Sequence, residues 1–502
     1  MSLYLLYNSF VVNLGFDNQK YIKLQSQNIK KRVAKFNKLY LEFGGKLFDD
    51  NHASRVLPGF EPDSKVKMLL SLKDKVEMVL VISADHIEKN KIRSDLGITY
   101  SQELLRLIDA FEAVELSIGG VVITHFNKQE EAIKLKKKLE KSKIKVAYHY
   151  TIDNYPNNVE NILSDNGFGK NEYLETTKEI VVVTAPGPGS GKMATCLSQM
   201  YHDNKRGLKS GYAKFETFPI WNLPLNHPVN LAYEAATADL SDVNMIDPFH
   251  LEAYNKIAVN YNRDVEVFPV LNDLLKRIMG KQIYKSPTDM GVNMVGDCIS
   301  DDSICQQAAK NEILRRYYDA AIQVRKDILN EDVLFKLETI MNKAGVTKDD
   351  RKVVTAANEL ANKTKEPAVA IEYNGQIITG KTSKLMGSSS AALLNVLKIA
   401  AGIEDIHLLS EFVLKPIQEL KTTYLKGNNP RLHTNEVLIA LAIESTNNEL
   451  CAKALKALEL LKGCQAHSSV ILSEVDVNTF KKLGINLTQD PVYQTKKLYH
   501  SK

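Results

Sequence analysis

The segment EIVVVTAPGPGSGKMATCLSQM, Glu179–Met200, predicts a buried strand that runs through a glycine-rich turn into a helix. Its valine run has the continuous apolar character of a strand covered on both faces. Lys192, Thr195 and Gln199 are expected on the side of the helix that faces solvent or a ligand. The opposite, apolar side predicts an amphipathic helix that begins near Gly191: Met193, Cys196, Leu197, Met200 and Tyr201.

The flanking sequence repeats this alternation of strand and helix. Runs rich in β-branched or aromatic residues occupy positions 76–83, 119–126, 144–150, 179–185 and 211–218, and helical patterns such as SQELLRLIDAFEAV lie between the first of them. Such alternation is typical of parallel sheets with crossover helices. The predicted fold class is α/β and multidomain, with a mostly parallel N-terminal sheet that carries a P-loop-like turn, a helical middle domain and a C-terminal α+β domain.

Changes in amino-acid composition and in hydrophobic pattern along the chain give the predicted domain boundaries. Residues 1–15 are an N-terminal extension, and residues 16–225 form the α/β domain with the glycine-rich anion loop. The chain then becomes rich in Asn, Asp, His and Pro, followed by long amphipathic helices, so residues 226–345 are expected to form a mainly helical domain. The hairpin-like segment PAVAIEYNGQIITG indicates the C-terminal α+β domain, residues 346–502.

Composition limits the class of partner. The 502 residues include 65 basic and 60 acidic side chains, a surplus that no arginine-rich block concentrates, so nucleic acid is not implied. No apolar run has the length of a membrane-spanning helix, and no membrane partner is expected. The five cysteines, in a chain without a secretory signal, indicate reduced thiols in a cytoplasmic protein.

Two segments compete as phosphate-binding loops. The P-loop expression G-x-x-x-x-G-K-[ST] has its literal match at Gly375–Thr382, GQIITGKT. There, however, the dipeptide Asn374-Gly375 signals a type I′ turn, and the residues after it have strand character. Their N–H groups are therefore expected to pair with another strand rather than with phosphate. We interpret this match as a hairpin.

The glycine-rich turn departs from that expression but has the required context. Its backbone N–H groups lie at the predicted positive end of a helix, where proteins commonly bind phosphate. Met193 stands where a magnesium-dependent triphosphatase has Ser or Thr, so the anion is expected to be held without the usual magnesium-binding hydroxyl. The structural alternative is a strand-to-helix turn whose lysine is only solvated. The predicted phosphate-binding residues are Gly187, Gly189, Ser190, Gly191, Lys192 and Thr195.

A second interpretation of the same segment is a dinucleotide site. Gly189–Ala194 matches G-x-G-x-x-A, and Glu216, at the end of the next predicted strand, is then the acid that binds a ribose hydroxyl. The lysine in the first helical turn is more typical of a phosphate clamp. A nucleotide is the candidate cofactor under either interpretation, and the use of a divalent metal stays open.

Polar side chains in irregular segments are candidates for the chemistry. Asp50, His52 and Arg55 could supply a base, an acid and an anion clamp, or they could form a self-satisfied network of capping turns. Asp85 follows the strand 76–83 at its carboxyl end, where open α/β sheets bind ligands, and is the carboxylate expected nearest the turn. Another irregular segment contains Lys285, Ser286, Thr288, Asp289, Asn293 and Asp297.

Long stretches of the sequence resemble a known bacterial family. They include FGGKLFDDNHASRVLPGF, TAPGPGSGKMATCLSQ and YKSPTDMGVNM. From about Phe16 to the C-terminus the chain resembles uncharacterised protein family zero-three-seven-one, which has a domain of unknown function. The resemblance implies soluble bacterial proteins with an α/β architecture and additional helical and α+β domains. It implies no reaction and no residue roles.

The sequence favours an enzyme that binds a small phosphorylated ligand or a nucleotide at Gly187–Lys192, with chemistry supplied by neighbouring polar loops. One alternative is a non-enzymatic binding protein in which the ligand regulates a homo-oligomer held together by the helical middle domain. The other alternative is a dinucleotide-binding oxidoreductase. The residues do not predict the reaction itself.

Overall fold

The computed structural model describes residues 14–48, 50–93, 96–240 and 242–495. The chain forms two compact units. The first comprises residues up to Glu234 together with Asp242–Ala309, and the second comprises Ala235–Ser241 with Lys310–Lys502. The expected N-terminal extension, residues 1–15, lies outside the described residues except for its last two positions.

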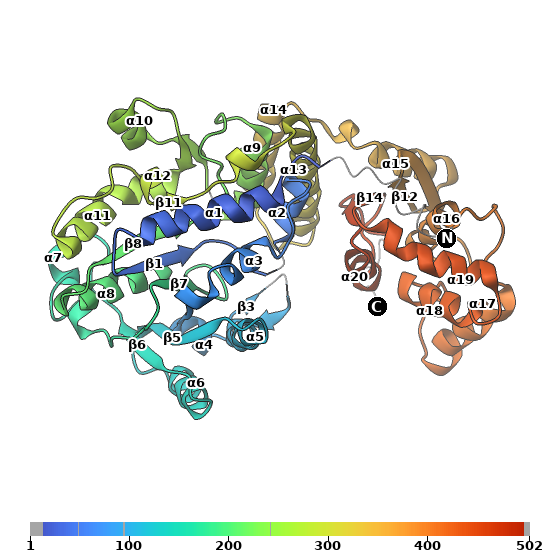
Figure 1. Ribbon diagram of the computed structural model, residues 1–502. Coiled ribbons are helices and arrows are strands. Elements are labelled where there is room, and N and C mark those ends of the chain that lie inside the picture. The colour runs from blue at the N-terminus through green and yellow to red at the C-terminus, as the bar shows by residue number, and fades with distance from the viewer. Residues whose placement is uncertain (1–13, 49, 94–95, 241, 496–502) are drawn as a thin grey trace, which may run out of the picture. The chain divides into compact units, whose positions relative to one another are not determined.

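A parallel sheet of seven strands organises the first unit (Figure 1). Its spatial order is β11-β8-β1-β7-β2-β5-β6, and all neighbouring strands are parallel. The expected α/β class and mostly parallel sheet are thereby confirmed. The strands are β1 (Lys38–Phe43), β2 (Val76–Ser83), β5 (Ser117–Phe126), β6 (Val146–Tyr150), β7 (Ile180–Thr184), β8 (Ser210–Phe215) and β11 (Gly291–Val292), with the separate pairs β3 (Ile92–Arg93) and β4 (Ile98–Thr99), and β9 (Asn244–Ile246) and β10 (Val259–Tyr261).

Helices connect these strands and cover the sheet. In Figure 1, α1 runs beside β1, and α5 packs on β2 and β5. The helices of the first unit are α1 (Asn18–Val33), α2 (Asn51–Val56), α3 (Ser64–Leu70), α4 (Ala84–Glu88), α5 (Tyr100–Ala113), α6 (Glu130–Lys141), α7 (Val159–Ile162), α8 (Lys192–Lys205), α10 (Pro248–Tyr254), α11 (Asn262–Met279) and α12 (Pro287–Met290), while α9 (Pro228–Ala236) and α13 (Asp302–Arg325) continue into the second unit.

One face of the sheet packs against α8 and α11. The buried cluster there combines strand side chains such as Tyr40, Val81 and Val183 with the apolar side of α8. Burial of these side chains is the main driving force that holds α8 on the sheet. The predicted apolar side is confirmed, because Met193 packs against the cluster and the other predicted residues are buried within it: Cys196, Leu197, Met200 and Tyr201.

The strand order reverses its direction between β1 and β7. From β1 the chain crosses to β2, on the β6 side, whereas from β7 it crosses through α8 to β8, on the β11 side. Right-handed crossovers in opposite directions place their helices on opposite faces of a sheet, so the connections diverge at the carboxyl ends of these two strands. Ligands of open α/β sheets bind at such a switch point, and the glycine-rich turn follows β7 there.

A mixed sheet of four strands forms the centre of the second unit. Its order is β13-β12-β14-β15, and only the β14–β15 pair is parallel. The strands are β12 (Ala368–Tyr373), β13 (Gln376–Lys381), β14 (Gln465–Ser468) and β15 (Asn486–Gln489), and the helices are α14 (Asp332–Ala344), α15 (Lys352–Thr364), α16 (Ser388–Ala400), α17 (Glu411–Glu419), α18 (Thr434–Glu444), α19 (Glu449–Lys456) and α20 (Glu474–Lys482).

The literal P-loop match lies in the β12–β13 hairpin. Asn374 and Gly375 have φ values of 50° and 77°, as a type I′ turn requires. The following residues pair with β12 in an antiparallel ladder, with Ile378 opposite Ile371. The prediction that this match is a hairpin and not a phosphate loop is confirmed.

Residues 226–345 do not form a third unit. The segment that contains α10, α11 and α12 belongs with the parallel sheet, because β11 pairs with β8 and the apolar side of α11 packs in the same cluster as α8. Helix α14 lies in the second unit. The structure therefore differs from the expected three-part division: α11 completes the core of the first unit, and α14 belongs to the second unit.

Candidate functional site

The glycine-rich turn joins β7 to α8 at the switch point of the sheet. Gly191 is the N-cap of α8 and has a left-handed backbone, with φ of 82°, which favours glycine. Gly187 approaches the Tyr100 hydroxyl so closely that an added Cβ would lie 2.4 Å from it. Side-chain bonds fix the turn from within: Ser190 Oγ donates to the Gly187 carbonyl at 2.9 Å, and Thr124 Oγ1 donates to the Ser190 carbonyl at 2.8 Å.

These bonds use carbonyl groups of the turn and leave its N–H groups available. Among the contacts of the described residues, none accepts a hydrogen bond from the backbone N–H groups of the turn. They lie at the start of a helix of 14 residues, where the helix dipole is positive. The residues concerned are Gly187, Gly189, Ser190, Gly191 and Lys192.

The three polar side chains expected on the outer side of α8 differ in their placement. Lys192 is half-buried and has no ion-pair partner among the described residues. Thr195 is fully buried, and its hydroxyl donates to the Gly191 carbonyl at 2.9 Å. Gln199 is also buried and bonds to the backbone of Leu174. Neither side chain faces solvent: the Thr195 hydroxyl is used by the Gly191 carbonyl of the turn, and the Gln199 amide is used by the backbone of Leu174.

Two aromatic side chains lie against the turn: His86, which the sequence places with Asp85 at the ligand-binding edge of the sheet, and Tyr100, which it did not single out. The His86 and Tyr100 rings meet edge to face, with centroids 5.0 Å apart, and an added Cβ on Gly189 would lie 3.5 Å from His86 Cε1. Burial lowers the pKa of His86, helped by the nearby Lys91 cation. Its Nδ1 is buried without a hydrogen-bond partner. The only sequence signal was the position of His86 one residue after Asp85, at the end of a strand.

Asp85 occupies the expected edge of the sheet, on α4 directly after β2. It is exposed, and its Oδ1 accepts a hydrogen bond from Gln129 Nε2 at 3.1 Å. In the described part of the chain it forms no ion pair with Lys192. The structure thus places both residues at one edge without joining them.

Asp50, His52 and Arg55, the predicted chemical group at α2, make contacts that stabilise the fold. Asp50 caps α2 by accepting from the Ala53 N–H, and it forms a buried ion pair with Lys65 at 2.8 Å. Burial acts to raise the pKa of Asp50, but Lys65, together with His52 and the Ala53 N–H, lowers it on balance. His52 packs against aromatic rings and Arg55 is half-buried in the same helix. No described contact joins the three to the glycine-rich turn.

Glu216 belongs to a buried charge cluster at the end of β8. Its carboxylate lies 2.6 Å from Lys214 Nζ, and Lys214 also pairs with Asp264. Burial raises the pKa of Glu216 to about 7, against the opposing effect of Lys214. The carboxylate that the dinucleotide interpretation assigns to a ribose is thus already paired with a lysine.

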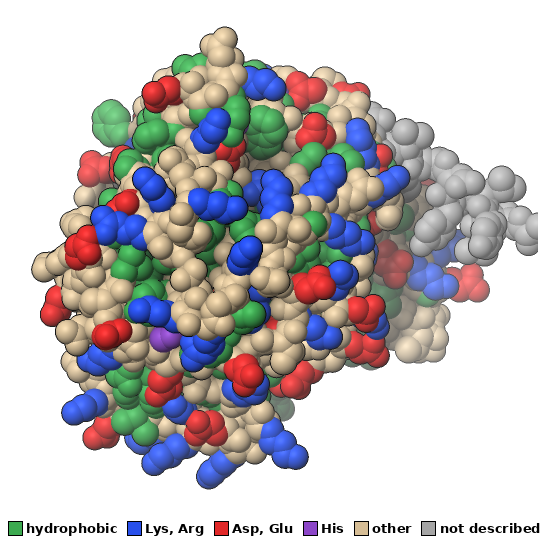
Figure 2. All heavy atoms as spheres, turned by 60° about the vertical axis from the view of Figure 1, so that its left-hand side comes forward, with side chains coloured by type: hydrophobic (Ala, Val, Ile, Leu, Met, Phe, Trp, Pro, Cys, Tyr) green, Lys and Arg blue, Asp and Glu red, His purple; other side chains and the backbone are tan. Residues whose placement is uncertain are grey.

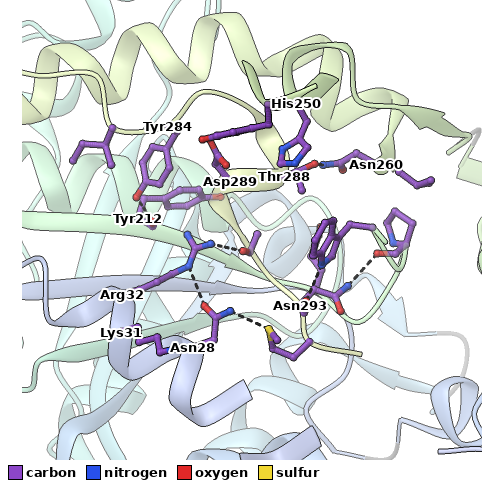
Figure 3. A pocket seen from close by; sticks show the side chains of 18 of the residues that line it. Asn28, Lys31, Arg32, Tyr212, His250, Asn260, Tyr284, Thr288, Asp289 and Asn293 are labelled. Carbon is purple, nitrogen blue, oxygen red and sulfur yellow. Dashed lines mark hydrogen bonds between the residues drawn. The ribbon is translucent and has the colours of Figure 1, made fainter. Parts of the chain in front are cut away.

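A cavity of about 450 Å³ lies at the β11 end of the sheet (Figure 3). It is lined by α1, by β8 and by residues from the segments 219–221, 250–260 and 283–294. Of the residues singled out in the last segment, Thr288, Asp289 and Asn293 line it. Glu216, which the dinucleotide interpretation singled out, also lines it. The other lining residues had no local signal, because they come from segments far apart in the sequence.

Comparison with known families covers nearly the whole chain. "Domain of unknown function DUF1846, N-terminal" matches residues 14–345, and "Domain of unknown function DUF1846, C-terminal" matches residues 349–499. The chain belongs to this family.

Curated relatives of this DUF1846 chain extend over nearly its full length. The UPF0371 protein SpyM50764 of Streptococcus pyogenes serotype M5 is 55% identical over 489 residues, 97% of this chain and 99% of the relative. The UPF0371 protein stu1377 of Streptococcus thermophilus is 55% identical over 488 residues, with the same coverage. The resemblance to an uncharacterised bacterial family is confirmed, and these names state no reaction.

The described residues of this DUF1846 protein form neither a metal-ligand cluster nor a membrane-spanning helix. No three His, Cys, Asp or Glu side chains among them are grouped as ligands for a metal ion. None of the described helices combines the length and the apolar character needed to cross a membrane. The five cysteines are free thiols.

Proposed function

We propose that this protein is an enzyme that binds a small phosphorylated ligand, such as a nucleotide, at the start of α8. The supporting observation is the set of unpaired N–H groups in Gly187–Lys192, at the positive end of a helix and at the switch point of a parallel sheet. N–H groups in this position bind the oxygen atoms of anions. The Lys192 ammonium adds a cation that has no counter-ion among the described residues.

The proposed ligand is held without a hydroxyl–magnesium contact from the first turn of α8. Met193 has no hydroxyl, and the Thr195 hydroxyl is bonded to the Gly191 carbonyl. This arrangement favours a ligand whose charge the N–H groups and Lys192 can balance alone, such as a monophosphate ester. A triphosphate would need further cations from elsewhere.

His86 is the residue best placed to move a proton at this site. Its lowered pKa favours the neutral imidazole at pH 7, its Nε2 lies 3.4 Å from Lys91 Nζ, and no described group bonds to its buried Nδ1. A neutral imidazole next to a bound phosphate ester can act as a general base. Asp85, on the same helix, is the second candidate for the chemistry.

The binding proposal is tested with Lys192→Gln. Because Lys192 has no described ion pair, the variant should fold like the wild type. We expect its affinity for phosphorylated compounds to fall by about tenfold to a hundredfold, the value of one charged hydrogen bond. Calorimetric titration with a panel of nucleotides and phosphate esters measures this loss. Lys209→Gln, an exposed lysine after α8, is the matched control. Equal binding by Lys192→Gln and wild type would contradict the proposal.

Turnover of the bound compound distinguishes an enzyme from a regulated binding protein. We expect the wild type to convert one member of the panel and His86→Gln to bind it with little conversion. Light scattering with and without ligand tests the alternative. Binding without turnover, together with a ligand-dependent change of molecular mass, would replace the enzyme with an assembly protein.

A further inference from the structure

One side of the cavity at the β11 end of the sheet is cationic. It is formed by one face of α1 and by the residues immediately after that helix. Asn28, Lys31, Arg32 and Lys35 are spaced by three and four residues, so they lie on one side of the helical path, and all four line the cavity. Figure 3 shows Asn28, Lys31 and Arg32 together on one side of it. Lys31 and Lys35 are exposed, whereas Arg32 is half-buried.

Arg32 is a partly buried cation that bonds to no carboxylate among the described residues, although the Asp289 charge acts on it from further away. Its Nη2 donates to the Gly291 carbonyl at 2.6 Å, and its Nε donates to Asn28 Oδ1 at 3.4 Å. No other bond of this guanidinium occurs within the described residues, so both N–H groups on Nη1 remain available. Burial lowers the pKa of Arg32, an unfavourable effect that a bound anion would relieve. The Gly291 carbonyl and the Asn28 side-chain amide fix the orientation of the planar guanidinium, which can then bind a phosphate through two N–H groups.

The opposite side of the cavity carries groups suited to hydroxyls. Figure 3 shows His250, Asn260, Thr288 and Asp289 gathered there, across from Arg32. His250 Nδ1 bonds to Ser286 Oγ at 3.0 Å, and no described partner occupies its Nε2. Asp289 Oδ2 accepts from the Tyr254 hydroxyl at 2.8 Å, which leaves Oδ1 available. A carboxylate oxygen and an imidazole nitrogen are typical partners of sugar hydroxyls.

An aromatic side chain that lines the cavity, Trp221, is fixed in its orientation. Trp221 Nε1 donates to the Asn293 carbonyl at 3.0 Å. Asn293 is itself held by hydrogen bonds to the backbone of Thr217 and Pro219. The indole therefore lines the cavity as a rigid apolar surface, against which the C–H groups of a sugar ring can pack.

We propose that this cavity is a binding site for a phosphorylated sugar. The phosphate lies on Arg32, with Lys31 and Lys35 at the entrance, and the ring lies against Trp221. The hydroxyls contact Asp289 and His250. A volume of about 450 Å³ is sufficient for such a compound.

The distribution of charged side chains on one face of the first unit is compatible with an anionic ligand. On the face of the first unit that Figure 2 brings forward, Lys and Arg side chains gather over the middle, and Asp and Glu side chains lie mostly toward the rim. A field of this sign attracts phosphorylated compounds and raises their association rate. The site shares no residue with the turn before α8, so it stands or falls independently of the proposed function.

The experiment is a calorimetric titration of the full chain with glucose 6-phosphate, fructose 6-phosphate and ribose 5-phosphate, and with glucose and inorganic phosphate separately. We expect at least one sugar phosphate to bind more tightly than either separate component. Arg32→Gln should weaken that binding by about tenfold or more. Lys31→Gln should weaken it less, because Lys31 is exposed, and Lys30→Gln is the matched control on the same helix. Lys31→Gln and Lys30→Gln decide the question if Arg32→Gln does not fold.

Three results would overturn the proposal. One is the absence of binding by all three sugar phosphates at millimolar concentration. Another is equal affinity for a sugar phosphate and for inorganic phosphate. The third is binding that Lys192→Gln weakens and Lys31→Gln does not, which assigns the ligand to the start of α8 and leaves the proposed function intact.

Discussion

Glu216 couples the stability of the first unit to pH. Burial raises the pKa of its carboxyl group to about 7, whereas the ordinary value, which applies to the unfolded chain, is 4.5. Between these two values the folded state keeps a proton that the unfolded state has lost. The free energy of unfolding therefore falls as the pH rises through this window.

Glu216→Gln removes this titration while it keeps the size of the side chain. As the pH is raised from about 5 to 8, we expect the free energy of unfolding of the variant to increase by about 1–3 kcal/mol relative to that of the wild type. Urea unfolding at a series of pH values measures the difference. Asp273→Asn, which alters an exposed carboxyl group on α11, is the control. A difference between Glu216→Gln and wild type that does not change with pH would show that Glu216 ionises normally.

Single residues could be predicted where their chemistry is local. The glycine-rich turn and Lys192 follow one another in the sequence, so their common position was evident. The buried hydroxyl of Thr195 was not, because its orientation depends on packing against the sheet. Arg32 is the clearest omission: it appears as one more basic residue of a helix, and its partner carbonyl, at Gly291, lies 259 positions away.

At the scale of elements, the predicted strands at 76–83, 119–126, 144–150, 179–185 and 211–218 correspond to β2, β5, β6, β7 and β8. The central strand β1 was not predicted, because Lys38 and Glu42 interrupt its apolar pattern. Both side chains are buried and paired with distant groups. Lys38 Nζ donates to Thr176 Oγ1 at 2.8 Å, and Glu42 accepts from the Tyr212 hydroxyl at 2.6 Å.

The turn between β12 and β13 gives a test at this scale. Gly375 has φ of 77° and nothing within 4 Å of an added Cβ, so Gly375→Ala would add backbone strain without a clash. We expect this variant to lose about 1–2 kcal/mol of the free energy of unfolding of the second unit. Denaturant unfolding measures the loss. Asn374→Gly, which accepts the same backbone region, should lie within about 0.5 kcal/mol of the wild type. Unchanged stability of Gly375→Ala would exclude the type I′ turn.

For the whole molecule, two separate cores imply two cooperative unfolding steps. Leu197 is fully buried in the cluster of the first unit, and Leu397 is fully buried in the core of the second. For Leu197→Ala and Leu397→Ala we expect two calorimetric transitions, and each substitution should lower the midpoint temperature of one of them. The free energy of unfolding of the affected unit should fall by about 2–5 kcal/mol. Each variant serves as the control for the other. A single transition that both substitutions shift would show that the units unfold together.

The division into two units could be predicted only in part. The change of composition near residue 346 lies at the boundary between the two family regions, which end and begin at 345 and 349, whereas the compact units divide at Ala309, within α13. The expected boundary near residue 226 does not agree, because α11 has the amphipathic pattern of any core helix. Its pattern does not reveal that its apolar side packs with α8 on the parallel sheet.

The position of β1 has a consequence for the synthesis of the chain. It is the first strand of the sheet to leave the ribosome, yet Leu39 pairs with Ile180, which is added about 140 positions later. At about 5–20 residues per second, β1 waits on the order of ten seconds for either of its neighbours. All six of its residues are buried in the finished sheet. The nascent chain therefore exposes an unpaired strand during translation, and a chaperone that binds extended apolar segments would protect it then.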